Sequence, residues 1–158
     1  ILIKKIISQM SKEIKILVIN GPNLNMLGKR EPELYGSRTL DEINSDLKSF
    51  SKSIKITLEF YQSNHEGEIL DLMHNKNNLI DGCVINAGAL THSSTALHDS
   101  IKSVDYPCVE VHMSNIYSRQ ESWRKKSLIA PVVIGTVQGF GEDSYISAIE
   151  LLAKKLKS

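Results

Sequence analysis

The chain has 158 residues, of which 41% are hydrophobic and 23% are charged, and its formal net charge is +1. This length suits one ordinary domain with a substantial core, and the composition excludes a disordered chain. Because the charges nearly balance, a generic nucleic-acid-binding surface is also excluded, and any charge on a ligand has to be met by local side chains. The sequence has no run of about 18 apolar residues, so it predicts no membrane span.

The N-terminal segment ILIKKIISQ is basic and apolar, but it lacks the long apolar stretch and the small-residue cleavage site of a signal peptide. Met10, followed by SKEIKILVIN, is a more natural beginning, which predicts that residues 1–9 are an upstream extension or a frayed arm. We therefore expect an N-terminal extension over residues 1–14, disordered in part, and a single domain over residues 15–158.

Beyond this segment, short runs rich in β-branched residues alternate with longer stretches of helical periodicity. In chain order, the predicted strands are Ile16–Asn20, Ile54–Tyr61, Cys83–Asn86, Cys108–Val111 and Val132–Val137. The first helix is predicted to begin after Thr39, because Thr39 and Glu42 form the signature of a capping box. Apolar stripes at helical spacing are formed by Leu40, Ile43, Leu47 and Phe50, by Ile69, Leu72 and Met73, by Ala96, Leu97 and Ile101, and by Tyr145, Ala148, Ile149, Leu152 and Leu156.

The alternation of strands and helices predicts a parallel sheet with right-handed crossovers. We expect an α/β fold of the flavodoxin-like kind, with a five-stranded parallel sheet in the order 2-1-3-4-5 and helices on both faces. Ligands of such sheets bind outside the carboxyl ends of the strands. Polar residues that follow the predicted strands, and that we expect at one rim, are Asn20, Asn23, Gln62, Asn64, Asn86, His92, His112 and Ser114.

Some of these polar residues also have a purely structural interpretation. Asn20 precedes Gly and Pro, and these residue types are common in turns. Asn86 equally suits a strand-to-loop turn, and a single histidine such as His92 near a helix start is more often structural than catalytic. His112 is different, because it follows Glu110 by two residues and alternation along a strand puts both side chains on one face. A carboxylate beside an imidazole orients the ring and favours its protonated form, as a general acid requires.

The two cysteines, Cys83 and Cys108, lie in apolar runs typical of neighbouring buried strands. This placement favours reduced thiols and a cytoplasmic location over a disulfide framework. No close Cys/His pair has the spacing of zinc ligands, so no metal site is expected.

Several classes of nucleotide and acyl chemistry are excluded by missing motifs. The sequence has no GxxxxGK[ST] phosphate loop, no GxGxxG fingerprint after the first strand and no GxSxG nucleophile elbow. The side chains that remain as candidates for chemistry are amides, imidazoles, a loop tyrosine and the arginines Arg30, Arg38, Arg119 and Arg124. This set suits an anionic substrate and proton transfer without a cofactor.

The motifs INGPNLNMLGKREPELYG, INAGALTHSS, EVHMSN and GFG, in this order and spacing, closely resemble those of type II 3-dehydroquinate dehydratases. The resemblance extends from about Ile16 to the final helix. It implies dehydration of 3-dehydroquinate to 3-dehydroshikimate in the shikimate pathway of aromatic amino acid biosynthesis, by proton abstraction through an enolate without a Schiff base. It also implies a flavodoxin-like fold and a homododecamer built as a tetramer of trimers.

The same resemblance implies a role for each matching residue. Tyr35 corresponds to the base, and Arg30 to the essential arginine that stabilises its phenolate and the transition state. Asn23 corresponds to the residue that holds a water against the enolate oxygen, and His112, with Glu110 behind it, to the proton donor. The residues that the resemblance assigns to substrate binding are Asn86, His92, Met113 through its backbone, Ser114, Arg124 and, from a neighbouring subunit, Asp99.

One feature departs from the family pattern. The family separates two arginines after the fourth strand by three residues, whereas Arg119 and Arg124 are separated by the four residues QESW. Which of the two reaches the substrate therefore stays open.

The long connection after the first strand carries Arg30 and Tyr35, and we expect it to act as a mobile lid that pivots at Gly28 and Gly36. The competing interpretation is a flavodoxin-like ligand-binding or signalling module without catalysis. It is disfavoured because this connection lacks the phosphate loop of a flavin binder and the acidic cluster of a receiver domain.

Overall fold

The computed structural model describes residues 13–29 and 36–158. The predicted residues Arg30 and Tyr35, and most of the predicted N-terminal extension, lie outside these ranges. Gly28 and Gly36, at the borders of the gap, both have positive φ angles, of 78° and 80°.

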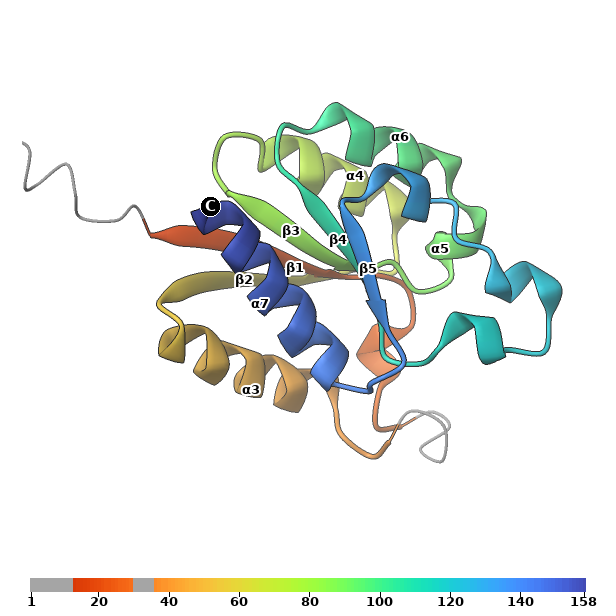
Figure 1. The fold of residues 1–158 in the computed structure, drawn as a ribbon. Coiled ribbons are helices and arrows are strands. Elements are labelled where there is room, and N and C mark those ends of the chain that lie inside the picture. The colour runs from red at the N-terminus through yellow and green to blue at the C-terminus, as the bar shows by residue number, and fades with distance from the viewer. Residues whose placement is uncertain (1–12, 30–35) are drawn as a thin grey trace, which may run out of the picture.

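Five parallel strands form one sheet in the order β2-β1-β3-β4-β5, as predicted from the sequence (Figure 1). The strands are β1 (Ile14–Asn20), β2 (Ile56–Gln62), β3 (Gly82–Asn86), β4 (Cys108–His112) and β5 (Gly135–Gln138). In register, Asn20 is the partner of both Gln62 and Asn86, and His112 is the partner of Gln138. The polar residues at the carboxyl ends of the strands therefore lie along one edge of the sheet.

Helices cover both faces of the sheet, which confirms the predicted layers (Figure 1). One face packs against α3 (Leu40–Ser53) and α7 (Asp143–Lys157), and the other against α4 (Glu66–Asn75) and α6 (Thr95–Ser103). The remaining short helices are α5 (Leu90–Ser93) and the 3-10 turns η1 (Leu24–Met26), η2 (Ile116–Ser118), η3 (Ser122–Lys125) and η4 (Ala130–Val132).

The hydrophobic core lies on both sides of the two central strands, β1 and β3. Along β1, Val18 packs with the α3 and α7 side, whereas Ile19 packs with the α4 and α6 side. All five residues of β3 are buried, as expected for a parallel strand covered on both faces. This burial holds the central strand ends, and the polar residues on them, in fixed positions.

Helix α3 begins where the sequence predicts. The Glu42 backbone N–H donates to Thr39 Oγ1 at 3.3 Å, and the Thr39 N–H donates to Glu42 Oε2 at 2.7 Å, which completes the capping box. The Thr39 N–H and the Thr39 hydroxyl, which also donates to Glu42 Oε2 at 3.0 Å, lower the pKa of the Glu42 carboxyl. Just before the helix, Arg38 binds Asp46 of α3 at 2.7 Å and Glu142, before α7, at 2.5 Å. Arg38 therefore ties the end of the long connection to both helices of this face.

Every strand differs from its predicted bounds at one end or both, and at two of the strand starts the structure shows why. The fifth strand begins at Gly135 rather than Val132, because Pro131 lies in the 3-10 turn η4, a position that suits its fixed φ and missing N–H. The second strand begins at Ile56 rather than Ile54, because α3 ends at Ser53 and Lys55 takes a positive φ of 58° before the strand.

Cys83 and Cys108 are both buried and free, and they are register partners on β3 and β4. Burial raises the pKa of the Cys83 thiol, which keeps it protonated. Within residues 13–29 and 36–158, no helix is both long enough and apolar enough to cross a membrane. The same ranges hold no group of three or more His, Cys, Asp or Glu side chains placed to bind a metal ion.

Candidate active site

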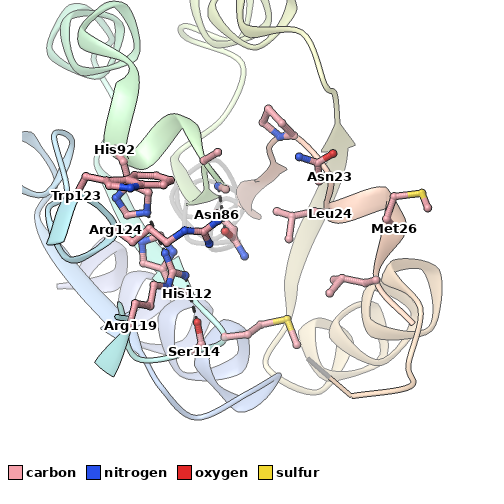
Figure 2. Close-up of a pocket in the computed structure, with 15 residues that line it drawn as sticks. Asn23, Leu24, Met26, Asn86, His92, His112, Ser114, Arg119, Trp123 and Arg124 are labelled. Carbon is pink, nitrogen blue, oxygen red and sulfur yellow. Dashed lines mark hydrogen bonds between the residues drawn. The ribbon is translucent and has the colours of Figure 1, made fainter. Parts of the chain in front are cut away.

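A cavity of about 260 Å³ lies at the carboxyl ends of β1, β3 and β4, where the fold predicts a ligand site (Figure 2). Its size suits a small molecule rather than a polymer. The residues that line it are Pro22, Asn23, Leu24, Met26, Leu27, Asn86, Gly88, Ala89, His92, His112, Met113, Ser114, Arg119, Trp123 and Arg124.

A buried pair of side chains from β4 forms one wall. His112 Nε2 lies 2.7 Å from Glu110 Oε1, and both residues are at most 4% exposed. Because a carboxylate accepts, Nε2 must carry the proton, which leaves Nδ1 as the ring nitrogen for a ligand in the cavity. The prediction that both side chains share one face of the strand is confirmed.

Ser127 supports this pair from behind. Its hydroxyl lies 2.8 Å from Glu110 Oε1 and 3.0 Å from Oε2, and it accepts the backbone N–H groups of Ile129 and Ala130. Since both acceptor sites of the hydroxyl are occupied by N–H groups, its proton is directed at Glu110. The carboxylate therefore has two donors, His112 and Ser127, although it is almost completely buried.

His92 is held as a neutral ring by its two neighbours. Its Nδ1 donates to the Lys126 carbonyl at 2.6 Å, so Nε2 is free to accept Arg119 Nη1 at 2.9 Å. Burial is the main cause that lowers the pKa of His92, and the nearby charges of Arg119, His112 and Arg124 lower it further. A second nitrogen of Arg119, Nη2, lies 3.2 Å from Ser114 Oγ. Arg119 thus connects two residues of the cavity wall.

Arg124 also lines the cavity, but it contacts other residues than Arg119 does. Its guanidinium carbon lies 4.9 Å from the centre of the Trp123 ring, and its Nε lies 3.6 Å from the Glu121 carboxylate. Together with Arg119, it makes this side of the cavity positively charged (Figure 2).

The floor of the cavity is fixed by a hydrogen-bonded network between strands and helix α7. Asn86 Nδ2 donates to the Tyr145 hydroxyl at 2.7 Å, and that hydroxyl donates to Asn20 Oδ1 at 2.6 Å. The Gly88 N–H donates to Asn86 Oδ1 at 3.3 Å, so the nitrogen and the oxygen of the Asn86 side chain each have a hydrogen-bond partner. Burial raises the pKa of Tyr145 above its ordinary value, which keeps the phenol neutral and able to donate.

Asn23 stands on the opposite wall in a left-handed conformation, with φ of 69°. Its backbone N–H donates to Asn64 Oδ1 at 2.9 Å, which ties the loop after β1 to the loop after β2. The loops after β1 and β3 also pack closely, since a Cβ atom on Gly21 would lie 2.4 Å from the Ala87 carbonyl oxygen. Glycine at this position is therefore required for Asn23 and Asn86 to face the same cavity.

Most of the site residues predicted from sequence come together here. Those that line the cavity are Asn23, Asn86, His92, His112, Met113, Ser114 and Arg124, and Glu110 lies directly behind His112. Asn20, Gln62 and Asn64 lie outside the lining and support it through hydrogen bonds. Asp99 does not join the cavity of its own chain: it lies on α6 with a side chain that is 79% exposed, 3.0 Å from His98. Arg30 and Tyr35 fall outside the described residues.

Three contributors were not predicted as site residues: Trp123, Ser127 and Tyr145. Tyr145 belongs to the predicted apolar stripe of the last helix, and it is buried there, but its hydroxyl partners lie 59 and 125 residues away in the sequence. In the sequence, Trp123 lies between Arg119 and Arg124. An aromatic residue beside arginines that are predicted to bind an anion is a signal that could have identified Trp123. No sequence pattern points to Ser127.

The parallel sheet is covered on both faces, and its strand ends carry a buried imidazole–carboxylate pair beside two arginines. This combination defines a class of α/β protein that binds a small anion and transfers a proton. The family model described as Dehydroquinase class II matches residues 14–153. The chain belongs to this family.

Individual relatives agree with the family. A 3-dehydroquinate dehydratase of Trichodesmium erythraeum is 50% identical over 143 residues, which cover 90% of this chain and 95% of the relative. Among solved structures, the type II dehydroquinase from Butyrivibrio crossotus matches with a TM-score of 0.87 and 45% identity, over 89% of this chain and 98% of that one. The type II dehydroquinase from Propionibacterium acnes matches with a TM-score of 0.83 and 33% identity, over 89% and 99%.

Proposed function

We propose that this protein is an enzyme, a 3-dehydroquinate dehydratase of type II, which removes water from 3-dehydroquinate to give 3-dehydroshikimate in the shikimate pathway. The observation that carries the proposal is the buried His112–Glu110 pair facing a cavity lined by Arg119 and Arg124. The family match over residues 14–153 and the relatives named as 3-dehydroquinate dehydratases support the same reaction.

In the proposed mechanism His112 is the general acid. Glu110 accepts from Nε2 and orients the ring, so that a proton on Nδ1 points into the cavity and can pass to the departing C1 hydroxyl of the substrate. Burial of the pair keeps water from competing for this proton. The leaving group then departs as water, and His112 is reprotonated before the next turnover.

The base in this mechanism is Tyr35, as the family resemblance implies. A tyrosine ordinarily has a pKa near 10, so a phenolate at neutral pH needs a nearby positive charge, which we assign to Arg30. Abstraction of the proton alpha to the ketone gives an enolate, and a water held by Asn23 stabilises its oxygen. Asn23 lines the cavity opposite His112, which suits this role.

We assign the substrate hydroxyls and carboxylate to Asn86, His92, Ser114, the backbone at Met113 and Arg124. All five line the cavity. Asp99 is exposed on α6, away from the cavity of its own chain, and we propose that it completes the site of a neighbouring subunit in a dodecamer built as a tetramer of trimers. Light scattering after size-exclusion chromatography measures this assembly directly.

We also propose that catalysis proceeds without a Schiff base. Among the described residues that line the cavity, none is a lysine. Borohydride reduction in the presence of 3-dehydroquinate should therefore leave the mass of the intact chain unchanged. A mass increase by the reduced substrate would contradict the non-covalent mechanism without contradicting the overall reaction.

The buried free cysteines also suit a cytoplasmic location.

The overall reaction is tested by following product absorbance after 3-dehydroquinate is added to the purified chain. Native protein should turn the substrate over, while Tyr35→Phe and His112→Asn should each lose most of kcat. Absence of turnover by the native chain contradicts the proposed function and favours a ligand-binding module. Undiminished turnover by Tyr35→Phe would contradict only the assignment of the base.

A further inference from the structure

Asn64, in the loop after β2, contacts the turn that carries Asn23, and the proposed mechanism gives it no role. Its Oδ1 accepts the backbone N–H of Asn23 at 2.9 Å, and because a backbone N–H can only donate, the atom facing it is the side-chain oxygen. The same oxygen accepts Gln62 Nε2 at 3.2 Å, and this nitrogen also lies 3.3 Å from the Gly21 carbonyl oxygen. Two side chains at the end of β2 therefore hold both ends of the turn over residues 21–23.

The backbone of Asn23 has a conformation that needs support. Its φ of 69° lies in the left-handed region, which residues other than glycine adopt rarely, although asparagine does so more readily than most. The Asn23 carbonyl accepts the Met26 N–H at 3.0 Å, whereas the Asn23 N–H donates to Asn64. Hydrogen bonds on both sides of the Asn23 Cα fix the direction in which its side chain leaves the backbone.

The Asn23 side chain is not used in this support. It does not cap the turn η1, and it lines the cavity opposite His112 (Figure 2). Its amide is therefore left for a ligand or a water, and the aim of this amide depends on the backbone behind it. Misplacing a group at a reaction centre by about 1 Å can lower the rate as much as a hundredfold.

We propose that Asn64 is a positioning residue, whose side-chain oxygen holds the left-handed backbone of Asn23 so that the Asn23 amide points at the water that stabilises the enolate oxygen. This inference rests on the proposed function, which assigns that water to Asn23. Asn64 does not line the cavity, so it acts on the reaction only through Asn23.

A purely structural role for Asn64 makes a different prediction. Both Asn23 and Asn64 are exposed, so their hydrogen bond contributes little to folding, and its loss as a structural contact would leave kcat unchanged. A positioning role lowers kcat instead, because the enolate forms only during the reaction. The two roles are separated by measuring kcat, KM and melting temperature on the same variants.

The first experiment compares steady-state kinetics of native protein, Asn64→Ala and Asn64→Asp. Asn64→Ala should lower kcat about three- to tenfold, the range expected for loss of one hydrogen bond, with KM within about twofold of native. Asn64→Asp keeps an oxygen at the position of Oδ1 and should recover most of kcat. Asn77→Ala is the matched control: Asn77 Oδ1 also accepts a backbone N–H from another loop, that of Asp105 at 2.8 Å, but where the chain approaches β3 and β4, away from the cavity. This control should keep the native kcat.

The second experiment asks whether Asn64 acts through Asn23. Asn23→Ala removes the side chain that is to be positioned, so adding Asn64→Ala to it should lower kcat no further. If the losses of the two single variants multiply instead, Asn64 acts elsewhere and the inference is overturned. A native kcat in Asn64→Ala, or an equal loss of kcat in Asn64→Asp, overturns it as well.

A third measurement separates this inference from the proposed function, which fails if the native chain does not turn over 3-dehydroquinate. Hydrogen exchange, followed by mass spectrometry on the peptide that holds Asn23, tests the contact without any turnover. One amide of this peptide should exchange faster in Asn64→Ala and at the native rate in Asn64→Asp. Unchanged exchange in Asn64→Ala overturns the inference even if the enzyme is active.

Discussion

At the scale of single residues, the position of one proton on His112 depends on groups that do not touch the cavity. Glu110 accepts from His112 Nε2, and Ser127 donates to the same carboxylate. A buried carboxylate held by two donors keeps one orientation, which fixes the direction of His112 Nδ1. The acid function thus depends on Ser127, whose hydroxyl is in turn fixed by two backbone N–H groups.

Ser127→Ala should lower kcat by about ten- to 150-fold and leave KM nearly unchanged, because a hydrogen bond to a charged group contributes about 1.5–3 kcal/mol. Ser127→Thr keeps the hydroxyl and should recover most of the activity. Steady-state kinetics of the two variants provide the measurement. If both variants were equally slow, the effect would come from packing around Ser127 and not from its hydroxyl.

A second prediction at this scale concerns His92 and pH. Burial, assisted by Arg119 and other nearby positive charges, lowers the pKa of His92, so the ring is neutral near neutral pH and Nε2 accepts from Arg119. When the pH falls through this lowered pKa, Nε2 gains a proton, faces the N–H of Arg119 and loses the hydrogen bond. KM should therefore rise toward acidic pH.

This rise in KM is measured from about pH 8 to about pH 5, a range that brackets the ordinary histidine pKa. His92→Gln removes the titrating ring and should flatten the dependence of KM on pH. A KM profile that is the same in native protein and His92→Gln would show that another group is responsible.

At the scale of elements, helix α7 acts on the site through the Tyr145 hydroxyl, which links Asn20 at the end of β1 with Asn86 at the end of β3. Tyr145→Phe leaves buried polar atoms of both asparagines without partners, which should lower the free energy of unfolding by about 1–3 kcal/mol. Because Asn86 lines the cavity, KM should rise as well. Chemical denaturation and steady-state kinetics measure the two effects.

Tyr106→Phe is the control for this change. The Tyr106 hydroxyl is also buried and donates to the Met73 carbonyl at 2.9 Å, but it lies away from the cavity. We expect a comparable loss of stability with an unchanged KM. A rise in KM in both variants would mean that general destabilisation, not the orientation of Asn86, weakens substrate binding.

The elements also show what sequence reasoning can and cannot find. The sheet order and the start of α3 were predicted because they depend on local patterns: strand–helix alternation and the pair Thr39 and Glu42. The strand ends were predicted as a site because parallel strands end at one edge. The contributions of Tyr145 and Ser127 depend on partners that only the folded chain brings near. The position of Tyr145 in an apolar stripe gives no sign of what its hydroxyl binds.

At the scale of the whole molecule, Asp99 stands apart from the other predicted site residues that the structure describes, because it neither lines the cavity of its own chain nor lies directly behind its wall. Asp99 extends from α6 with a largely exposed side chain, whereas the cavity lies at the carboxyl ends of β1, β3 and β4. If a neighbouring subunit supplies Asp99, the activity is a property of the assembly, and a site needs native residues from two different chains. Variants in two different residues should then complement each other.

The test uses Asp99→Ala and His112→Asn, each of which should be poorly active as a pure oligomer. In oligomers assembled at random from equal amounts of both chains, about a quarter of the sites pair a native His112 with a native Asp99 from the neighbour, so activity should recover to about a quarter of the native value. Co-refolding the two chains and measuring product formation gives this fraction. If Asp99 served its own chain, no site in the mixture would hold both native residues, and the mixture would be no more active than the average of its two parents.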